Sequence, residues 1–272
     1  MPRHIVCLTF DFDAMSGFVA NGQVTPTPVS RGEFGAVGVK RITRLLKQYD
    51  ILGSFFIPGV VIGTYPRECA MLVESGHEIG HHGWTHVRPA SLPREQEEEH
   101  LQRGNDAIKR ISGKNARGYR SPAWDLSPHT IELLLKHGFT YDSSLMGDDY
   151  TPYHCRLGDV VATDGPMQFG QPSALIEMPI SWSLDDYPHF EFARTPGLMN
   201  ANGVLENFLD DFLWMKRHLD WGVLTYTFHP YVIGRGHRML MLERLILRLI
   251  DNGAVFMPME QAAAEFAGRR SA

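Results

Sequence analysis

The stretch IVCLTFDFD, residues 5–13, decides the fold because it opens a pattern that repeats along the whole chain. It begins as an apolar, β-branched run typical of a buried strand and ends in two aspartates. In the later segment 39–49, apolar residues recur every three or four positions, which predicts one face of a helix. Strands that alternate with helices are the units from which parallel sheets are built.

Short strand-like stretches and longer helical segments alternate to the end of the chain. The strand candidates are 5–12, 53–57, 77–82, 116–120, 139–143, 176–182, 223–228 and 254–257. The helical segments include 39–49, 93–110, 127–136, 205–219 and 239–250. No Pro- or Gly-rich linker divides the series. We therefore predict one α/β domain over residues 1–272, folded as a (β/α) barrel with about seven or eight parallel strands rather than as an open sheet.

The composition excludes several classes of protein. Hydrophobic residues make up 43% and charged residues 21% of the 272 residues, which argues against disorder, collagen and coiled coil. The formal net charge is −5 and no block of Lys or Arg stands out, so we expect no nucleic-acid partner. The longest apolar-rich stretch without charge, 51–66, is short for a membrane span, so we expect no membrane partner either.

The cysteines and the start of the chain indicate the compartment. Cys7, Cys69 and Cys155 are odd in number and fit no metal-ligand spacing, which favours reduced thiols. The first ten residues enter a β-like run without the pattern of a secretory signal. We expect a cytoplasmic protein.

Side chains able to do chemistry gather where the predicted strands end. In a parallel barrel, functional residues lie at the C-terminal ends of strands. Here those ends carry FDFD (10–13), HHGWTH (81–86), YRSPAW (119–124), SWSLDD (181–186) and TFHP (227–230). Acids, histidines and an arginine should therefore meet at one rim of the barrel.

Two histidines and a carboxylate are a common ligand set for a divalent metal ion with open coordination positions. Spacing alone leaves two histidine pairs, His77/His81 and His82/His86. His77 lies at the start of its strand, away from the rim, whereas Gly83 allows the chain to turn between His82 and His86. We prefer the second pair and assign His77 and His81 to structural roles.

Asp11 and Asp13 lie two residues apart on a strand, so their side chains should share one face. Two carboxylates on one face repel unless a cation lies between them or one carries a proton. This favours a division of labour, in which one aspartate binds the metal ion and the other acts as a general base. The alternative is an Asp turn at the strand end.

These motifs, in this order, resemble the five motifs of the polysaccharide deacetylase family, also called the NodB-homology or carbohydrate esterase 4 family. The match runs over about residues 5–260. The resemblance implies a distorted (β/α) barrel. It also implies a metal-dependent hydrolase that cleaves non-peptide C–N bonds, chiefly the N-acetyl groups of amino sugars.

The resemblance also assigns roles to single residues. Asp13, His82 and His86 would bind the divalent metal ion, for which Zn²⁺ is preferred and Ni²⁺, Co²⁺ and Mn²⁺ are alternatives. Asp11 would act as the general base and Arg120 would hold it.

On the other side of the site, the resemblance makes His229 the general acid. A carboxylate often orients such a histidine, and Asp185 or Asp186 would do so here; the sequence leaves that choice open. Aromatic rings at the barrel mouth can form apolar walls for a flat substrate. The residues that we predict to contact substrate are Trp124, Trp182 and Arg31.

Departures from the family pattern leave the substrate open. Phe12 separates two acids that are adjacent in members acting on chitin or peptidoglycan, and Trp124 replaces a smaller, more open segment. The stretches SRGEFG (30–35) and HPYVIGRGHR (229–238) resemble a branch with the Helicobacter-type peptidoglycan deacetylase, cyclic imide hydrolases and metal-free allantoinases. Barrels of this branch often form tetramers, so a homo-oligomer is also expected.

Three hypotheses about function follow. The first is N-deacetylation of an amino-sugar, peptidoglycan-type or small amide substrate by metal-activated water. The second is ring opening of a cyclic imide or ureide. The third is a barrel without catalysis that binds a small molecule.

Overall fold

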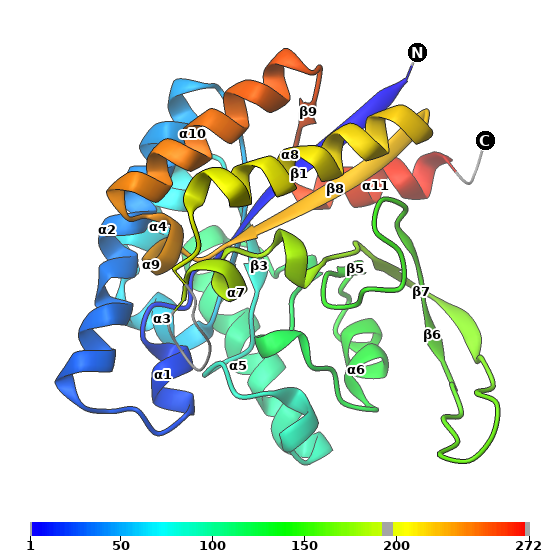
Figure 1. Cartoon of the computed structure of the whole chain (residues 1–272). Helices are drawn as coiled ribbons and strands as arrows, with labels where there is room; N and C mark the ends of the chain where they lie inside the picture. Colours follow the sequence, from blue (N-terminus) through cyan, green and yellow to red (C-terminus); the bar gives the residue numbers. More distant parts are fainter. Residues whose placement is uncertain (1, 192–197, 270–272) are drawn as a thin grey trace.

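The computed structural model describes residues 2–191 and 198–269, in which strands and helices alternate (Figure 1). The strands are β1 (Arg3–Asp11), β2 (Ser54–Ile57), β3 (Glu78–His81), β4 (Gly118–Tyr119), β5 (Tyr141–Asp142), β6 (Tyr153–Leu157), β7 (Gln171–Glu177), β8 (Trp221–Phe228) and β9 (Val255–Phe256). The helices are α1 (Ser16–Ala20), α2 (Pro26–Gln48), α3 (Gly59–Thr64), α4 (Pro66–Glu74), α5 (Arg94–Ser112), α6 (Thr130–Lys136), α7 (Asp186–Phe190), α8 (Ala201–His218), α9 (Pro230–Ile233), α10 (Gly236–Asp251) and α11 (Met259–Arg269). Short 3-10 turns lie at Pro89–Ser91, Pro122–Trp124 and Trp182–Leu184.

The strands form one curled sheet in the order β6-β7-β5-β4-β3-β2-β1-β8, and β9 also pairs with β1. Every pair is parallel except β6 with β7. A bridge between Asp185 and Thr227 links the segment after β7 to β8, the strand at the other end of this order. The sheet thus curls into a distorted half-barrel. This confirms the predicted α/β barrel and its approximate number of parallel strands.

The side chains of β1 point alternately to the two faces of the sheet, and they contribute to two separate parts of the core. Val6 and Leu8 point to the outer face and join the large cluster made with the surrounding helices. Ile5 and Cys7 point to the inner face and join a smaller cluster. Because successive strand residues face opposite sides, Thr9 and Asp11 continue the inner row. The inner row therefore changes from apolar to polar towards the C-terminal end of β1.

Helix α11 covers the apolar part of the inner face. Its buried residues Met259, Ala262 and Phe266 belong to the same cluster as Ile5 and Cys7. The N-terminal end of the half-barrel is therefore filled by a helix. The C-terminal ends of the strands, with their polar side chains, form the opposite rim.

The region around β6 and β7 differs from the prediction. The expected strand 176–182 is found earlier, as β7, and β6 was not predicted. The two strands form an antiparallel hairpin that extends away from the body (Figure 1). Four of the five side chains of β6 are half-buried, so its sequence has no continuous apolar run to reveal it.

Two further expectations can be compared with the structure. Within residues 2–191 and 198–269, no helix has both the length and the apolar character needed to cross a membrane. Cys7, Cys69 and Cys155 are buried and free.

Candidate active site

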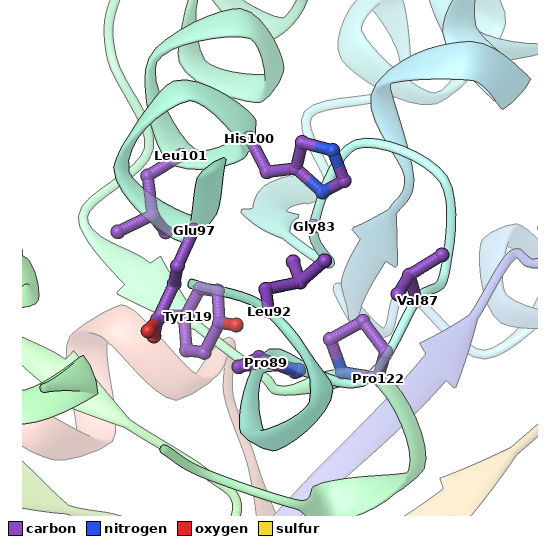
Figure 2. Close-up of a pocket in the computed structure, with 9 residues that line it drawn as sticks. All are labelled: Gly83, Val87, Pro89, Leu92, Glu97, His100, Leu101, Tyr119 and Pro122. Atoms are coloured by element: carbon purple, nitrogen blue, oxygen red, sulfur yellow. The ribbon is translucent and has the colours of Figure 1, made fainter. Parts of the chain in front are cut away.

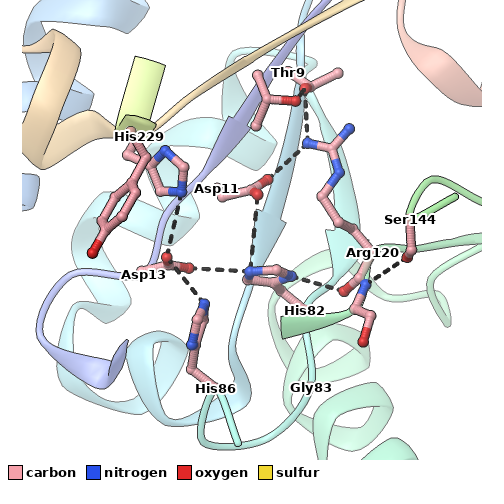
Figure 3. A network of polar contacts seen from close by, with 12 residues as sticks. Thr9, Asp11, Asp13, His82, Gly83, His86, Arg120, Ser144 and His229 are labelled. Carbon is pink, nitrogen blue, oxygen red and sulfur yellow. Dashed lines mark hydrogen bonds and ion pairs between the residues drawn. The ribbon is translucent and has the colours of Figure 1, made fainter. Parts of the chain in front are cut away.

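The polar side chains of the rim come from the ends of β1, β3, β4 and β8 (Figure 3). Asp11 ends β1 and Asp13 follows it by two residues, so both carboxylates lie on the inner side. His82 directly follows β3, Arg120 directly follows β4 and His229 directly follows β8. The parallel sheet therefore brings together side chains that are more than a hundred residues apart in sequence.

Asp13, His82 and His86 form a compact cluster. Asp13 Oδ1 lies 3.3 Å from His82 Nε2, and Asp13 Oδ2 lies 3.3 Å from His86 Nε2. One ligand atom of each of the three lies within 4.8 Å of the others. The Nδ1 of His82 lies 2.7 Å from the backbone carbonyl oxygen of Arg120 and donates to it, which directs Nε2 towards Asp13.

These donors fit a divalent cation. Asp13 is 5% exposed, and its Oδ1 has no hydrogen-bond partner among the described residues. Burial alone would raise the pKa of Asp13, but the neighbouring imidazoles of His86 and His82 hold it well below its usual value. A buried carboxylate of this kind needs positive charge nearby. Two imidazole nitrogens and a carboxylate are ligands that Zn²⁺ and related ions prefer.

The loop between His82 and His86 has an unusual backbone. Gly83 has φ +73°, in the left-handed region, and a Cβ there would lie 3.0 Å from Pro122 Cγ. His86 itself has φ 58°, which is uncommon for a residue other than glycine. Such strained positions occur at functional sites when the surrounding structure holds them in place.

The segment after His86 packs closely on its neighbours (Figure 2). It shares with α5 and the end of β4 a cavity of about 10 Å³, room for about one water molecule. Val87, Leu92, Leu101 and Tyr119 are among the residues that line this cavity. The cavity is too small for a substrate.

Arg120 holds Asp11 from inside the barrel. It is fully buried, and its Nη1 donates to Asp11 Oδ1 and to Thr9 Oγ1, each at 2.8 Å. Its Nε and Nη2 donate to the carbonyl oxygen and the Oγ of Ser143, at 3.1 and 2.9 Å. The other carboxylate oxygen of Asp11, Oδ2, lies 3.9 Å from His82 Nε2. Asp11 therefore has one oxygen fixed and one that faces the cluster.

Sequence reasoning missed Thr9 and Ser143 as members of this network. The signal for Thr9 was available, because it lies two residues before Asp11 on the same strand face. Ser143 gave no such signal. Its hydroxyl is fully buried and accepts a hydrogen bond from Arg120, which gives it a place in holding the guanidinium.

His229 lies on the opposite side of Asp13, with Nε2 3.8 Å from Asp13 Oδ2. Its Nδ1 lies 2.8 Å from Asp186 Oδ1, which also accepts the His229 backbone N–H. Asp185 Oδ1 is further away, at 3.4 Å, and accepts the backbone N–H of Tyr187 at the start of α7. Burial opposes a charged ring, but the two carboxylates outweigh it and raise the pKa of His229 well above its usual value. Asp186 is thus the hydrogen-bond partner that the sequence left undecided.

The predicted substrate-contact residues lie in two places. Trp124 and Trp182 stack on each other, with ring centroids 4.0 Å apart; Trp124 is buried and Trp182 is 43% exposed. Arg31, on α2, forms an ion pair with Glu191 and lines a separate cavity beside Tyr231. Their contacts with substrate stay predictions.

The other two histidines of the strand candidate 77–82 lie outside the cluster. His77 Nδ1 accepts the backbone N–H of Gly53 at 3.1 Å. His81 Nδ1 accepts the N–H of Gly83, and its Nε2 lies 3.0 Å from the carbonyl oxygen of Leu101. Both imidazoles are engaged with the backbone, and their positions agree with the structural roles we expected.

A curled, mostly parallel sheet with a carboxylate–histidine cluster at its C-terminal rim is the architecture of a barrel hydrolase. Residues 1–141 match the family model described as polysaccharide deacetylase. The chain belongs to the polysaccharide deacetylase family, and it is a hydrolase that acts on non-peptide C–N bonds. The family expected from the motifs is therefore confirmed.

Individual relatives agree with this assignment. The peptidoglycan deacetylase of Helicobacter pylori is 37% identical over 259 residues, which cover 89% of this chain and 88% of the relative. A Mycobacterium smegmatis protein grouped with the polysaccharide deacetylases has a solved structure with a TM-score of 0.87 and 28% identity, covering 99% of this chain and 92% of its own. An allantoinase structure superposes with a TM-score of 0.83 over 98% of this chain and 91% of its own. At 20% identity, that likeness shows the fold alone.

Proposed function

We propose that this chain removes the N-acetyl group from an amino-sugar, peptidoglycan-type or small amide substrate. In this proposal Asp13, His82 and His86 hold a divalent metal ion, preferably Zn²⁺. The observation that carries it is the buried Asp13 carboxylate, which lies 3.3 Å from both imidazoles and has one oxygen without a hydrogen-bond partner among the described residues. The relative from Helicobacter pylori, which is named a peptidoglycan deacetylase, supports the same reaction.

A Zn²⁺ ion held by these three residues would act as a Lewis acid towards the amide carbonyl and towards water. Asp11 Oδ2 faces the cluster and takes the proton of the attacking water as general base. Arg120 fixes the other oxygen, so the carboxylate cannot rotate away. As the water oxygen bonds to the carbonyl carbon, the C–N bond is weakened.

His229 completes the reaction from the opposite side. Its raised pKa favours the imidazolium, which gives the Nε2 proton to the departing nitrogen. The hydrogen bond from Nδ1 to Asp186 orients the ring for this transfer. The C–N bond breaks, and the products are acetate and a free amine.

Acetate release from N-acetylated chitooligosaccharides, measured beside ring opening of succinimide and dihydrouracil, tests this function. Acetate release should stop when a chelator removes the metal ion and return with Zn²⁺. Asp13→Ala and His86→Ala should lose both the metal ion and the activity, whereas His218→Ala, at an exposed histidine of α8, should keep both. Ring opening without acetate release would contradict deacetylation, and full activity of metal-stripped protein would contradict the role of the metal ion.

The substrate and compartment that we propose follow from general properties of the chain. A net charge of −5 without a basic block supports a small-molecule or amino-sugar substrate rather than nucleic acid. The free, buried cysteines are compatible with a reducing compartment and support a cytoplasmic location.

A further inference from the structure

A second cavity, of about 660 Å³, lies next to the candidate active site. This volume is in the range of small-molecule pockets. Tyr231 lines the cavity, and its ring lies 6.1 Å from the ring of His229, measured between centroids. Phe190, at the end of the helix that Asp186 begins, also lines it. Tyr231 therefore lies between the cavity and the proposed catalytic histidine.

The described lining of this cavity is rich in positive charge. Arg31, Arg235 and Arg238 all line it, together with His237. The acid in the lining, Glu191, forms an ion pair with Arg31. Burial lowers the pKa of Arg235, and the charges of Arg41 and Arg31 lower it further, so the guanidinium groups repel one another. A bound anion would relieve this repulsion.

Arg238 is the most deeply placed of these cations. It is 8% exposed, and its Nη1 and Nη2 donate to the backbone carbonyl oxygens of Val232 and Phe190, at 3.0 and 3.1 Å. Its Nε is buried and has no hydrogen-bond partner among the described residues. Burial lowers the pKa of Arg238, and the charge of Arg235 lowers it further, whereas the carboxylate of Asp186 raises it. Arg238 is thus a fixed cation in the wall, and no carboxylate in the described part of the chain is hydrogen-bonded to it.

The beginning of α10 adds to this positive potential. Arg235 is the N-cap residue of the helix, and its side chain makes no capping hydrogen bond. Gly236 and His237, in the first turn, line the cavity, and that turn contains no acidic residue. The free N–H groups at the start of a helix favour a negative charge.

From this geometry we propose that the cavity is a subsite for a carboxylate of the substrate. Arginine guanidinium groups bind carboxylates in a directed, bidentate manner, and the apolar walls of Phe190 and Tyr231 suit the organic skeleton that carries the carboxylate. This inference rests on the proposed function. The substrate class it names is an N-acylated amine with a carboxylate distant from the scissile amide, rather than a neutral chitin-type oligosaccharide.

Paired probes test the subsite separately from catalysis. The probes are N-acetyl-γ-aminobutyrate and N-acetyl-ε-aminocaproate, each compared with its neutral carboxamide. Binding is measured by calorimetry on the full chain after chelator treatment, and acetate release is measured on the Zn²⁺-loaded protein. We expect at least one of the carboxylates to bind about tenfold or more tightly than its carboxamide, because hydrogen bonds between charged groups contribute on that order.

Two variants test whether the arginines of the cavity cause the preference for the carboxylate. Arg235→Gln, at an exposed position, should remove the preference for the carboxylate and leave carboxamide binding unchanged. Arg44→Gln, at an exposed arginine of α2 that is not part of the cavity lining, should keep the preference. Equal binding of carboxylate and carboxamide, no binding of either carboxylate, or an Arg235→Gln variant that keeps the preference would overturn the subsite.

The two proposals fail in different ways. Acetate release from both members of each pair with equal efficiency would leave the proposed function standing and remove the subsite. A carboxylate preference in binding, lost in Arg235→Gln, without acetate release from any probe would support the subsite and count against deacetylation.

Discussion

Each charged residue of the site is held by a different partner. Asp11 is paired with Arg120, and His229 with Asp186, so both have a direct partner of opposite charge. Asp13 has imidazoles on both sides and a carboxylate oxygen without a hydrogen bond among the described residues. Because an uncompensated buried charge is costly, Asp13 is the residue at which a cation would stabilise the site most.

The variant Asp11→Asn tests the proposed role of Asp11 as general base separately from the binding of the metal ion. The amide cannot accept the proton of the attacking water, so kcat should fall by about 100- to 10,000-fold. The content of bound metal ion should stay unchanged, because Asp11 is not one of the proposed ligands. Metal analysis and acetate release on the same sample check both statements. Asp164→Asn, at an exposed aspartate, is the control, and loss of the metal ion in Asp11→Asn would make Asp11 a ligand instead.

His77 predicts a dependence of stability on pH. Burial lowers its pKa to about 4, below the ordinary 6.5, so the unfolded chain binds its proton more readily than the folded protein does. Stability is therefore lost as the pH falls from about 6.5 towards 4. At pH 5 this residue should cost about 2 kcal/mol of unfolding free energy.

His77→Asn should remove this part of the pH dependence, since an amide oxygen can accept the Gly53 N–H without titrating. Urea unfolding at pH 7 and pH 5 measures the difference. His218→Asn, at an exposed histidine, should keep the slope of the parent protein. Identical slopes for the parent and His77→Asn would show that His77 does not carry the effect.

A motif can identify a functional residue that lies at the end of a predicted strand. It cannot identify a residue whose role is to hold another side chain in place. Asp11, Asp13, His82 and Arg120 could be named from the sequence because they end predicted strands. Ser143 could not, because its role depends on where the guanidinium of Arg120 lies across the barrel. The choice between Asp185 and Asp186 depended on a difference of 0.6 Å in their distances from His229 Nδ1, 3.4 against 2.8 Å.

Among the elements, the loop after β3 determines where His86 lies. Its turn depends on Gly83, which has a positive φ and little room for a Cβ beside Pro122. Strand β1 was predicted from its continuous apolar run, and α10 from its helical periodicity. Strand β6 was not predicted, because its half-buried residues give no apolar signal, and the strand expected at 176–182 lies earlier, as β7.

Gly83→Ala should reduce the affinity for the metal ion by about tenfold or more. The Cβ would contact Pro122, and a left-handed conformation costs a residue with a side chain about 1–2 kcal/mol, so the loop would shift. Gly113→Ala is a matched control, since Gly113 has φ +77° and nothing within 4 Å of its Cβ position. Both variants should lose similar stability, but only Gly83→Ala should bind Zn²⁺ more weakly in a competition titration. Equal Zn²⁺ affinity in both variants would contradict this role.

For the whole molecule, alternation of strands and helices predicted an α/β domain with parallel strands, and the chain length favoured a barrel over an open sheet. The strand pattern did not show how far the sheet closes, because the contact across the opening is a single bridge between Asp185 and Thr227. The sequence also did not predict that a helix covers the N-terminal end of the half-barrel. Helix α11 fills that end, which leaves the opposite rim for chemistry.

The variant Phe266→Ala tests whether packing at the α11 end of the half-barrel is independent of activity at the opposite rim. Phe266 is 6% exposed in the inner cluster and stacks on Trp221, so its loss should cost about 3–5 kcal/mol of unfolding free energy. Activity per folded molecule should not change, because the site lies at the other end. Trp214→Ala, at a ring 54% exposed on α8, should change neither quantity much. A fall in kcat of the folded Phe266→Ala protein would show that the two ends are coupled.

The central claim is that Asp13, His82 and His86 hold one divalent cation. The most direct measurement is the anomalous scattering of a crystal of the full chain, collected at the zinc edge after loading with Zn²⁺. The account predicts one strong peak at bonding distance from the Asp13 carboxylate, His82 Nε2 and His86 Nε2, absent in crystals of Asp13→Ala. A peak instead within the second group of acids and histidine, Asp185, Asp186 and His229, or no peak near Asp13, would contradict it.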